Sequence, residues 1–346
     1  MMATATDLGQ LLRRAADRTV SFPYKRWGFG EAVAMLGLLA ASRAAGDDRY
    51  RSAVVAGFDR WWSARRGTLG FADHVTPGLA LLSLARRDRR WMPAALALGR
   101  LFARAPVLHG VPVHRPDLDR FRSHVWVDCL YTDGAFLALL GLETGDDQWS
   151  DLACAHTRAY VEVLWDASSG LFCHGYDAET RRANAVHWGR GNGWALMGLV
   201  DLLRFLPTAQ EFRRTLADVI GRQVEAMVRL QDASGHWHTV VDRPETYLES
   251  SVAAMMAWAV PQAVRLGAVP AGLRETALTA AASARAAALT ATDPEGNLTG
   301  VSEATPAEDL ATYATRPTGV YPWGQGPLLL ALADAIAPDS VWEVVP

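Results

Sequence analysis

Cysteine is scarce in this chain, with three residues among 346. Cys129, Cys154 and Cys173 form no CxxC pair and no zinc-like spacing, which argues against a disulfide framework or a structural metal site. This cysteine usage fits a reducing compartment, so we expect a cytoplasmic protein.

An excess of charge of one sign is also missing. The chain has 34 basic and 37 acidic residues, for a formal net charge of -3. This balance provides no basic field for nucleic acid or for a membrane surface. Any anionic substrate must therefore be held by a local cation.

Long hydrophobic runs, a leader and a linker are not evident. The apolar run Ala32–Ala41 is too short to cross a bilayer, and the amphipathic segment Met1–Arg18 lacks the apolar core of a secretion signal. Because no stretch rich in Pro, Gly and Ser divides the chain, we expect a single domain over residues 1–346.

Strand signals are few. The best are Gly170–Cys173 and Thr239–Asp242, which we interpret as short hairpin pieces within loops.

His236 and His238 have no third ligand nearby in the sequence, so we expect no metal site. The segment Pro106–Arg122 is a long connection of the kind that often shapes a cleft.

Helical patterns of two alternating kinds fill most of the chain. Segments rich in small apolar residues on all sides are typical of helices buried all round, and amphipathic segments with charged faces lie between them. If neighbours are antiparallel, the apolar helices form an inner ring and all point the same way. We expect an all-α toroid with inner helices at Ala32–Ala44, Leu79–Arg87, Leu130–Leu142, Ala195–Phe205, Ser251–Leu266 and Pro327–Ala337, and outer helices at Leu8–Arg18, Tyr50–Arg65, Arg90–Arg104, Asp147–Trp165, Ala209–Leu230 and Gly272–Ala291.

Each inner segment is preceded by a short motif of Trp, Gly and polar residues, so these motifs should share one rim. Helix N-termini carry unpaired N–H groups and partial positive charge, which suits an anionic ligand such as a sugar carboxylate. The chain has 13 Trp, and flat aromatic faces at a rim suit sugar rings. Alternatively, these Trp pack loops onto the toroid. The Trp residues at the entrances are Trp27, Trp126, Trp188, Trp194 and Trp323.

Two carboxylates are candidates for acid–base chemistry. Asp128 stands at the first turn of an apolar helix, and Asp73 precedes another. Each could be an ordinary N-terminal cap. Facing one cavity, however, the pair could have pKa values pushed apart, supplying an acid and a base.

Arg190 is framed by glycines, which would let a ligand approach its guanidinium. It is the best candidate for a bidentate carboxylate clamp, and an ion pair with Asp128 or Asp73 is a compatible alternative. His174 lies in a loop, where a structural hydrogen bond and a substrate contact are both open.

These residues carry a resemblance to a known family. The string Trp188-Gly-Arg-Gly-Asn-Gly-Trp194, with Leu171-Phe-x-His174-Gly-Tyr-Asp177 and Trp126-Val-Asp128, resembles the unsaturated rhamnogalacturonyl and glucuronyl hydrolases of glycoside hydrolase families 105 and 88, family 105 more closely. The resemblance implies an (α/α)6 barrel without a cofactor or metal. The substrate that it implies is a small anionic oligosaccharide produced by a polysaccharide lyase, and the terminal uronate of this oligosaccharide carries a C4=C5 double bond. Among such substrates, the resemblance favours one in which the uronate is linked to rhamnose.

The implied reaction adds water across this enol ether. By position, Asp128 resembles the general acid and base, and Asp73 the second family Asp. His174, Trp188 and Arg190 resemble the substrate-binding set, which Trp194 and Trp27 extend.

Cys129 and the Pro106–Arg122 loop depart from the family pattern, which leaves the choice of substrate open. A conventional glycosidase using Asp73 and Asp128, an isomerase resembling sugar 2-epimerases, and a carbohydrate-binding scaffold without activity stay as alternatives. The isomerase would need two His residues across the cavity, and the sequence places only His174 well.

Overall fold

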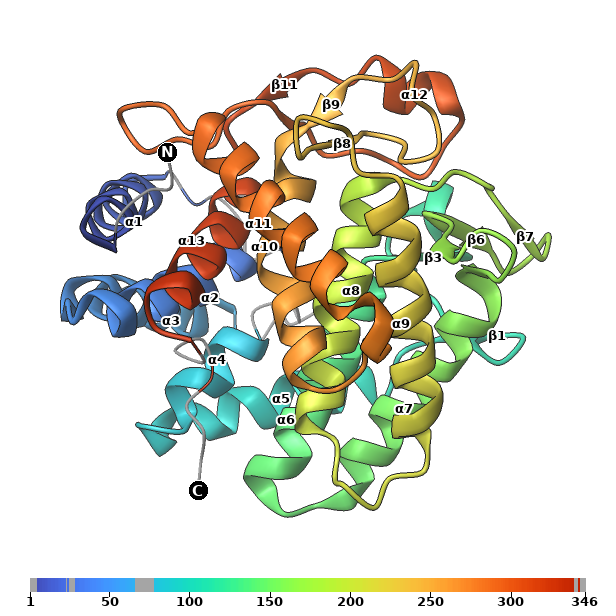
Figure 1. Ribbon diagram of the computed structural model, residues 1–346. Helices are drawn as coiled ribbons and strands as arrows, with labels where there is room; N and C mark the ends of the chain where they lie inside the picture. The colour runs from blue at the N-terminus through green and yellow to red at the C-terminus, as the bar shows by residue number, and fades with distance from the viewer. Residues whose placement is uncertain (1–4, 23, 25–28, 66–77, 339–341, 343–346) are drawn as a thin grey trace.

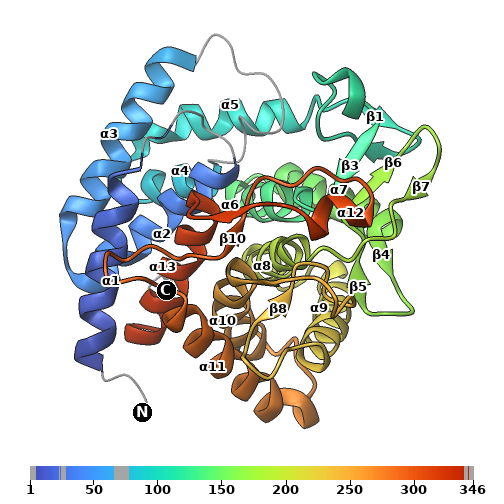
Figure 2. The same ribbon diagram turned by 90° about the horizontal axis from the view of Figure 1, so that it is seen from above.

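The computed structural model describes residues 5–22, 24, 29–65, 78–338 and 342. Helices of the two predicted kinds alternate along this part of the chain and form an inner ring inside an outer ring (Figures 1 and 2). The inner helices are α2 (Phe29–Ala45), α4 (Gly78–Ala85), α6 (Ala135–Thr144), α8 (Gly189–Phe205), α10 (Ser250–Arg265) and α13 (Pro322–Ile336). The outer helices are α1 (Ala5–Val20), α3 (Asp48–Arg65), α5 (Met92–Phe102), α7 (Asp147–Leu164), α9 (Phe212–Arg229) and α11 (Arg274–Thr290).

Contacts between the inner helices close the ring. Each inner helix packs against the next one in the chain, and α13 packs against α2. Each outer helix lies against an inner helix next to it in sequence. The predicted (α/α)6 barrel is therefore confirmed.

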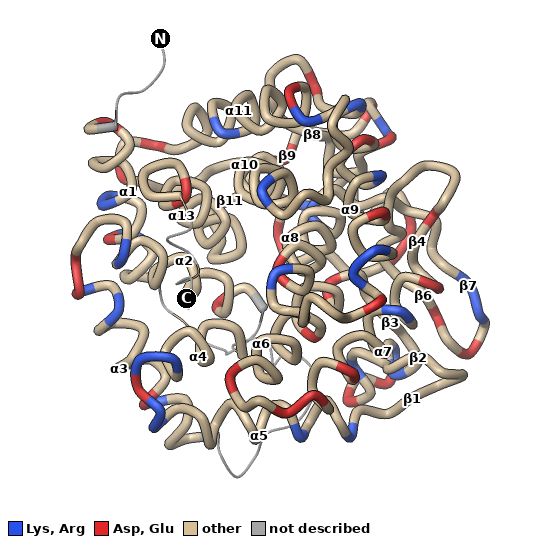
Figure 3. The backbone as a smooth tube through the Cα atoms, turned by 60° about the horizontal axis from the view of Figure 1, so that its bottom comes forward, with Lys and Arg blue, Asp and Glu red and all other residues tan. Residues whose placement is uncertain are grey.

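The difference in composition between the two rings explains the arrangement. Every residue of α4 is buried, whereas charged residues of both signs are scattered over the periphery (Figure 3). Apolar helices bury their whole surface in the inner ring, and amphipathic helices cover them. In the part of the chain described here, no helix is long and apolar enough to span a membrane.

Glycines let the first and last inner helices approach closely. A Cβ added to Gly37 would lie 2.8 Å from the backbone oxygen of Gly326, and one added to Gly326 would lie 2.5 Å from the backbone carbon of Val33. The helices α2 and α13 therefore pack backbone to backbone.

Two inner helices begin differently from the prediction. A π-helical turn, η4 (Leu130–Gly134), precedes α6. Helix α8 begins at Gly189 rather than at Ala195, so the Trp–Gly motif is helical rather than a loop. Its glycines serve packing, because a Cβ at Gly191 would lie 2.6 Å from Val127 and one at Gly193 would strike Met255.

The strands β8 (Trp237–His238), β9 (Leu248–Glu249) and β11 (Thr318–Gly319) lie with α12 (Leu310–Ala314) over one end of the barrel, at the top of Figure 1, and β1 (Val107–Leu108) lies at its side. The predicted strand at Gly170–Cys173 is confirmed by β5. The prediction at Thr239–Asp242 is correct in part, because Val240 forms an isolated antiparallel bridge with Trp188, whereas the strand itself lies just before and residues 241–242 form a turn. The paired strands are β1 (Val107–Leu108) with β2 (Val111–Pro112), β3 (His124–Trp126) with β6 (Gly175–Asp177), β6 with β7 (Arg182–Ala183), β4 (Trp165–Asp166) with β5 (Leu171–Phe172), β8 (Trp237–His238) with β9 (Leu248–Glu249), and β10 (Val301–Ser302) with β11 (Thr318–Gly319).

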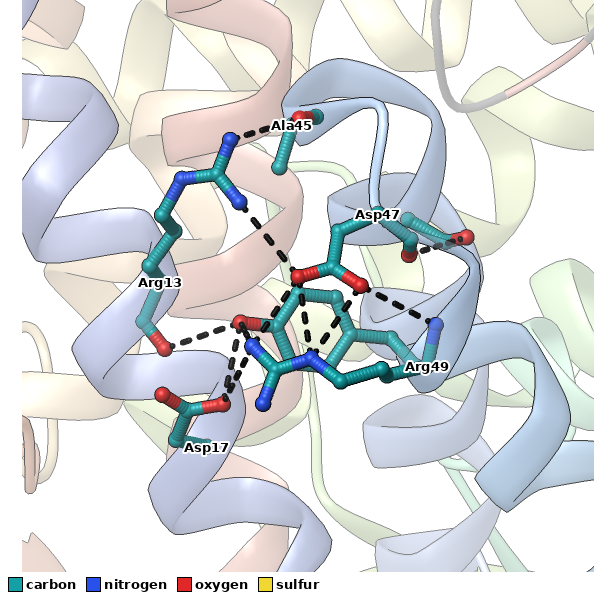
Figure 4. A network of polar contacts seen from close by, with 7 residues as sticks. Arg13, Asp17, Ala45, Asp47 and Arg49 are labelled. Atoms are coloured by element: carbon teal, nitrogen blue, oxygen red, sulfur yellow. Dashed lines mark hydrogen bonds and ion pairs between the residues drawn. The ribbon is translucent and has the colours of Figure 1, made fainter.

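A polar network fastens the outer helix α1 to the turn between α2 and α3 (Figure 4). Arg13 donates to the backbone oxygen of Ala45 at 2.7 Å and pairs with Asp47 at 3.4 Å. Arg49 pairs with Asp47 at 2.9 Å and with Asp17 at 3.4 Å. Because most of these side chains are solvent-exposed, we expect the network to fix the position of α1 more than to add stability.

Near the carboxyl end of α8, Asp201 is fully buried. The indole N–H of Trp342 donates to its Oδ1 at 2.8 Å, and Arg204 Nε lies 3.8 Å away. Burial raises the pKa of Asp201 to about 7, against the opposing effects of Arg204 and Trp342. Between about pH 4 and pH 7, the Asp201 carboxyl therefore keeps its proton in the folded chain but loses it in an unfolded chain.

We expect Gly326→Ala to destabilise the barrel. The added methyl group would meet the backbone of Val33, which cannot rotate away, so a loss of about 1–3 kcal/mol in the free energy of unfolding is expected. Gly9→Ala is the control, because nothing lies within 4 Å of its added Cβ and alanine favours helix. Urea denaturation of both variants provides the measurement. Equal stability of Gly326→Ala and wild type would contradict this view of ring closure.

We expect Asp201→Asn to remove a pH dependence of stability. Since the carboxyl has the higher pKa in the folded chain, wild-type stability falls as pH rises from about 4 to about 7. Asparagine keeps an acceptor for Trp342 and carries no charge. At about pH 8 the variant should be more stable by roughly 2–4 kcal/mol, and below about pH 4 the two should converge. Urea titrations across this range would contradict the prediction if the difference stayed constant.

Candidate active site

The entrances of three inner helices meet at the end of the barrel that carries the hairpins. Asp128 lies just before η4, Arg190 lies in the first turn of α8, and Glu249 caps α10 by accepting the Val252 N–H. Arg190 and Glu249 are 3.4 Å apart. The contacts agree with the prediction that the inner helices share one rim at their N-termini.

Asp128 faces His174. Its Oδ2 lies 3.6 Å from His174 Nε2, and the two residues are only 6% and 1% exposed. This Oδ2 accepts no hydrogen bond from the described residues, and no side chain caps η4. The alternative interpretation of Asp128 as a helix cap is therefore not supported.

Electrostatics keeps this pair in defined protonation states. Burial on its own would raise the pKa of Asp128, but His174, with the nearby His114 and Arg190, holds it below the ordinary value. Burial lowers the pKa of His174, although Asp128 opposes this effect. Near neutral pH, Asp128 is therefore ionised and His174 neutral.

Arg190 is 0% exposed, and protein acceptors surround its guanidinium. Its two terminal nitrogens donate to the backbone oxygens of Ser302 at 2.9 Å and Glu303 at 2.8 Å, in addition to the Ser302 hydroxyl and Glu249. Its Nε is buried without a hydrogen-bond partner in the described part of the chain. Of the two roles predicted for Arg190, the ion pair is present, and its partner among the described residues is Glu249 rather than Asp128.

The two tryptophans of the motif are buried. The Trp188 ring lies 4.2 Å from the His174 ring, centroid to centroid, and 4.4 Å from the Arg190 guanidinium carbon. Trp194 is 0% exposed and packs against Tyr131. In this structure Trp188 therefore supports His174 and Arg190, and neither indole presents the open face that we predicted for sugar stacking, because protein groups cover both.

The remaining candidates, Asp73 and Trp27, lie outside the described residues. Their predicted roles as second carboxylate and binding-wall residue stay predictions. In the ranges that the structure describes, no group of three or more His, Cys, Asp or Glu side chains is arranged to hold a metal ion.

The comparisons with known proteins agree with this geometry. The family described as Glycosyl Hydrolase Family 88 matches residues 9–337. The chain belongs to glycosyl hydrolase family 88. A structure of a possible member of the GH105 family from Klebsiella pneumoniae subsp. pneumoniae MGH 78578 has 26% identity, with a TM-score of 0.86 over 97% of this chain and 94% of that one.

Two curated relatives are similar over part of this family 88 chain. The unsaturated rhamnogalacturonyl hydrolase YesR of Bacillus subtilis (strain 168) is 28% identical over 62% of this chain, which spans 61% of that protein. The unsaturated 3S-rhamnoglycuronyl hydrolase of Formosa agariphila is 24% identical over 66% of each chain.

Several residues of the site were not predicted from the sequence. Tyr313 on α12 bonds His174, and its own partner is Asn184. His114, from the long Pro106–Arg122 connection, bonds the Cys129 thiol at 2.9 Å and so lies beside Asp128. Only the tertiary fold brings these residues together, since Tyr313 lies 139 positions from His174 in the sequence.

We expect Arg190→Ala to destabilise this family 88 protein. Removing the guanidinium leaves the buried Glu249 carboxylate without its cation, and a loss of about 3–5 kcal/mol in the free energy of unfolding is expected. The control is Arg229→Ala, since that exposed guanidinium donates a long hydrogen bond of 3.4 Å to the Ser169 backbone oxygen, and its loss should change stability by less than about 0.5 kcal/mol. If both variants unfold at the same urea concentration as wild type, Arg190 does not organise the rim.

Proposed function

We propose that this protein is an unsaturated uronyl hydrolase. It acts on a lyase-generated oligosaccharide and hydrates the C4=C5 double bond of the 4,5-unsaturated uronic acid at the non-reducing end. A proton is added at C4, which leaves an oxocarbenium-like centre at C5, and water attacks C5. The resulting hemiketal opens and releases the remaining sugar.

The burial of Asp128 and its position beside His174 are the main support for this proposal. A buried carboxyl that caps no helix and lies beside a neutral imidazole is suited to proton transfer. In the proposed reaction Asp128 donates its proton to C4 and then, as the conjugate base, takes one from the attacking water. One carboxyl thus serves both steps, and Asp73 would hold sugar hydroxyls.

The free enzyme holds Asp128 ionised, whereas a general acid must carry a proton. The substrate resolves this conflict, since a uronate carboxylate beside Asp128 adds a like charge and raises its pKa. Binding also excludes water, which disfavours the ionised form further. The substrate itself therefore promotes protonation of the acid that attacks it.

Recognition of the uronate is assigned to the cationic side of the site. The terminal nitrogens of Arg190 are bonded to protein oxygens and its Nε–H is buried, so Arg190 attracts the carboxylate by its positive charge rather than by a direct hydrogen bond. The entrance tryptophans Trp126 and Trp323 are partly exposed and are better placed than Trp188 for stacking on a sugar.

For the neighbouring sugar we propose rhamnose. The names of the two curated relatives, a rhamnogalacturonyl and a rhamnoglycuronyl hydrolase, support this choice. The loop that carries His114 lies close to Asp128 and would border the position of the second sugar.

Asp128→Asn should abolish turnover while keeping the fold. The amide has nearly the same volume but cannot deliver a proton, so kcat should fall by at least about 100-fold. Loss of the ultraviolet absorbance of the unsaturated uronate measures the reaction. Asp48→Asn is the matched control, because Asp48 pairs with Arg51 in the first turn of the outer helix α3, next in the chain to the carboxyl end of α2 rather than at the rim. Wild-type turnover in Asp128→Asn would reject the assignment.

A panel of lyase-generated oligosaccharides of defined linkage tests the substrate. We expect absorbance loss with uronyl-rhamnose substrates and no cleavage of the saturated counterparts. Cleavage of the saturated sugars would favour the conventional two-carboxylate glycosidase instead.

A further inference from the structure

A chain of hydrogen bonds leads from Asn184 through Tyr313 to His174, whose other ring nitrogen faces Asp128. Asn184 Nδ2 lies 3.0 Å from Tyr313 Oη, and Tyr313 Oη lies 2.6 Å from His174 Nδ1. On the other side of the imidazole, His174 Nε2 lies 3.6 Å from Asp128 Oδ2. The direction in which each proton points decides what His174 offers to Asp128.

The backbone fixes the orientation of the Asn184 amide. Its Oδ1 accepts from the backbone N–H groups of Gly175 at 3.2 Å and Val186 at 3.3 Å. Only an oxygen can accept these bonds, so the NH2 group must face Tyr313. It also donates to the backbone oxygen of Glu308 at 3.2 Å, which agrees with this orientation.

The orientation of Asn184 sets the Tyr313 hydroxyl. Its oxygen accepts the Asn184 N–H, and among the described residues His174 Nδ1 is the one possible acceptor within hydrogen-bond distance of it. The single proton of the hydroxyl therefore points to His174 Nδ1. The phenol is protonated at all ordinary pH values, because burial raises its pKa far above the usual value. His174 Nδ1 is then an acceptor, and the proton of the neutral imidazole is on Nε2, toward Asp128.

We propose that Tyr313 and Asn184 are positioning residues for the reaction proposed above, which lock His174 in its Nε2–H tautomer. The imidazole then donates toward Asp128 Oδ2, which leaves Oδ1 as the oxygen that exchanges a proton with the substrate. In the opposite tautomer, a lone pair on Nε2 would face a carboxylate, and the two would repel each other. The tautomer of His174 does not depend on the proposed function, and only the expected effect on turnover rests on it.

Two variants test the lock. Tyr313→Phe removes the donor and keeps the ring, so the His174 tautomers should become mixed. Asn184→Asp reverses the chain, because a carboxylate accepts the Tyr313 proton and Tyr313 then accepts from Nδ1–H. The Nδ1–H tautomer should therefore predominate in this variant.

The measurement is the pair of imidazole 15N chemical shifts of His174 in the free enzyme, assigned with His174→Gln. A merely structural role for Tyr313 would not change these shifts. We also expect kcat for the unsaturated uronide to fall roughly 10- to 100-fold in both variants, with little change in KM. Tyr24→Phe, which loses a hydroxyl bonded to the Thr19 backbone oxygen, is the control and should match wild type in both readouts.

The outcomes separate the two proposals. An Nδ1–H tautomer in the wild type, or an unchanged Nε2–H tautomer in both variants, would overturn the lock. If wild type leaves unsaturated uronides intact, the proposed function fails, but the 15N shifts of the free enzyme still decide the tautomer.

Discussion

The buried guanidinium of Arg190 is the constraint on which the rim of this barrel depends. A charge that is 0% exposed must be surrounded by acceptors, since leaving it unpaired would cost several kcal/mol. Glu249 and the backbone oxygens of Ser302 and Glu303 meet this need. One side chain thus joins the entrances of α8 and α10 to the segment that leads into α12.

The buried guanidinium of Arg190 also affects the residues proposed for catalysis. Trp188 lies between the guanidinium of Arg190 and the ring of His174 in the contact network, and His174 faces Asp128. The positive charge also lowers the pKa of Asp128. Arg190, which the sequence predicts to be a ligand clamp, therefore supports His174 and Asp128 in the structure, and its Nε–H is the guanidinium donor without a partner among the described residues.

Sequence reasoning succeeded where local patterns determine the structure. The alternation of apolar and amphipathic segments predicted all the inner and outer helices. A helix that is buried on all sides differs in composition from a helix with one solvent-exposed face. The sequence led us to expect that the glycines around Arg190 make room for a ligand, and in the structure Gly191 and Gly193 permit close packing against Val127 and Met255. Room for a ligand cannot be distinguished from close packing without knowing the neighbouring elements. Tyr313 and His114 were missed because their roles come from contacts across the fold.

The closure of the ring by α2 and α13 has a consequence for synthesis. The face of α2 that receives α13 is made well before its partner, because Ala45 at the end of α2 and Pro322 at the start of α13 lie far apart in the sequence. Until then, apolar surface of the first inner helix has no permanent cover, and contacts this distant in sequence form slowly. A nascent chain of this architecture therefore depends on α13 for a sealed interior, which makes chaperone protection during translation more important than for a fold with local contacts.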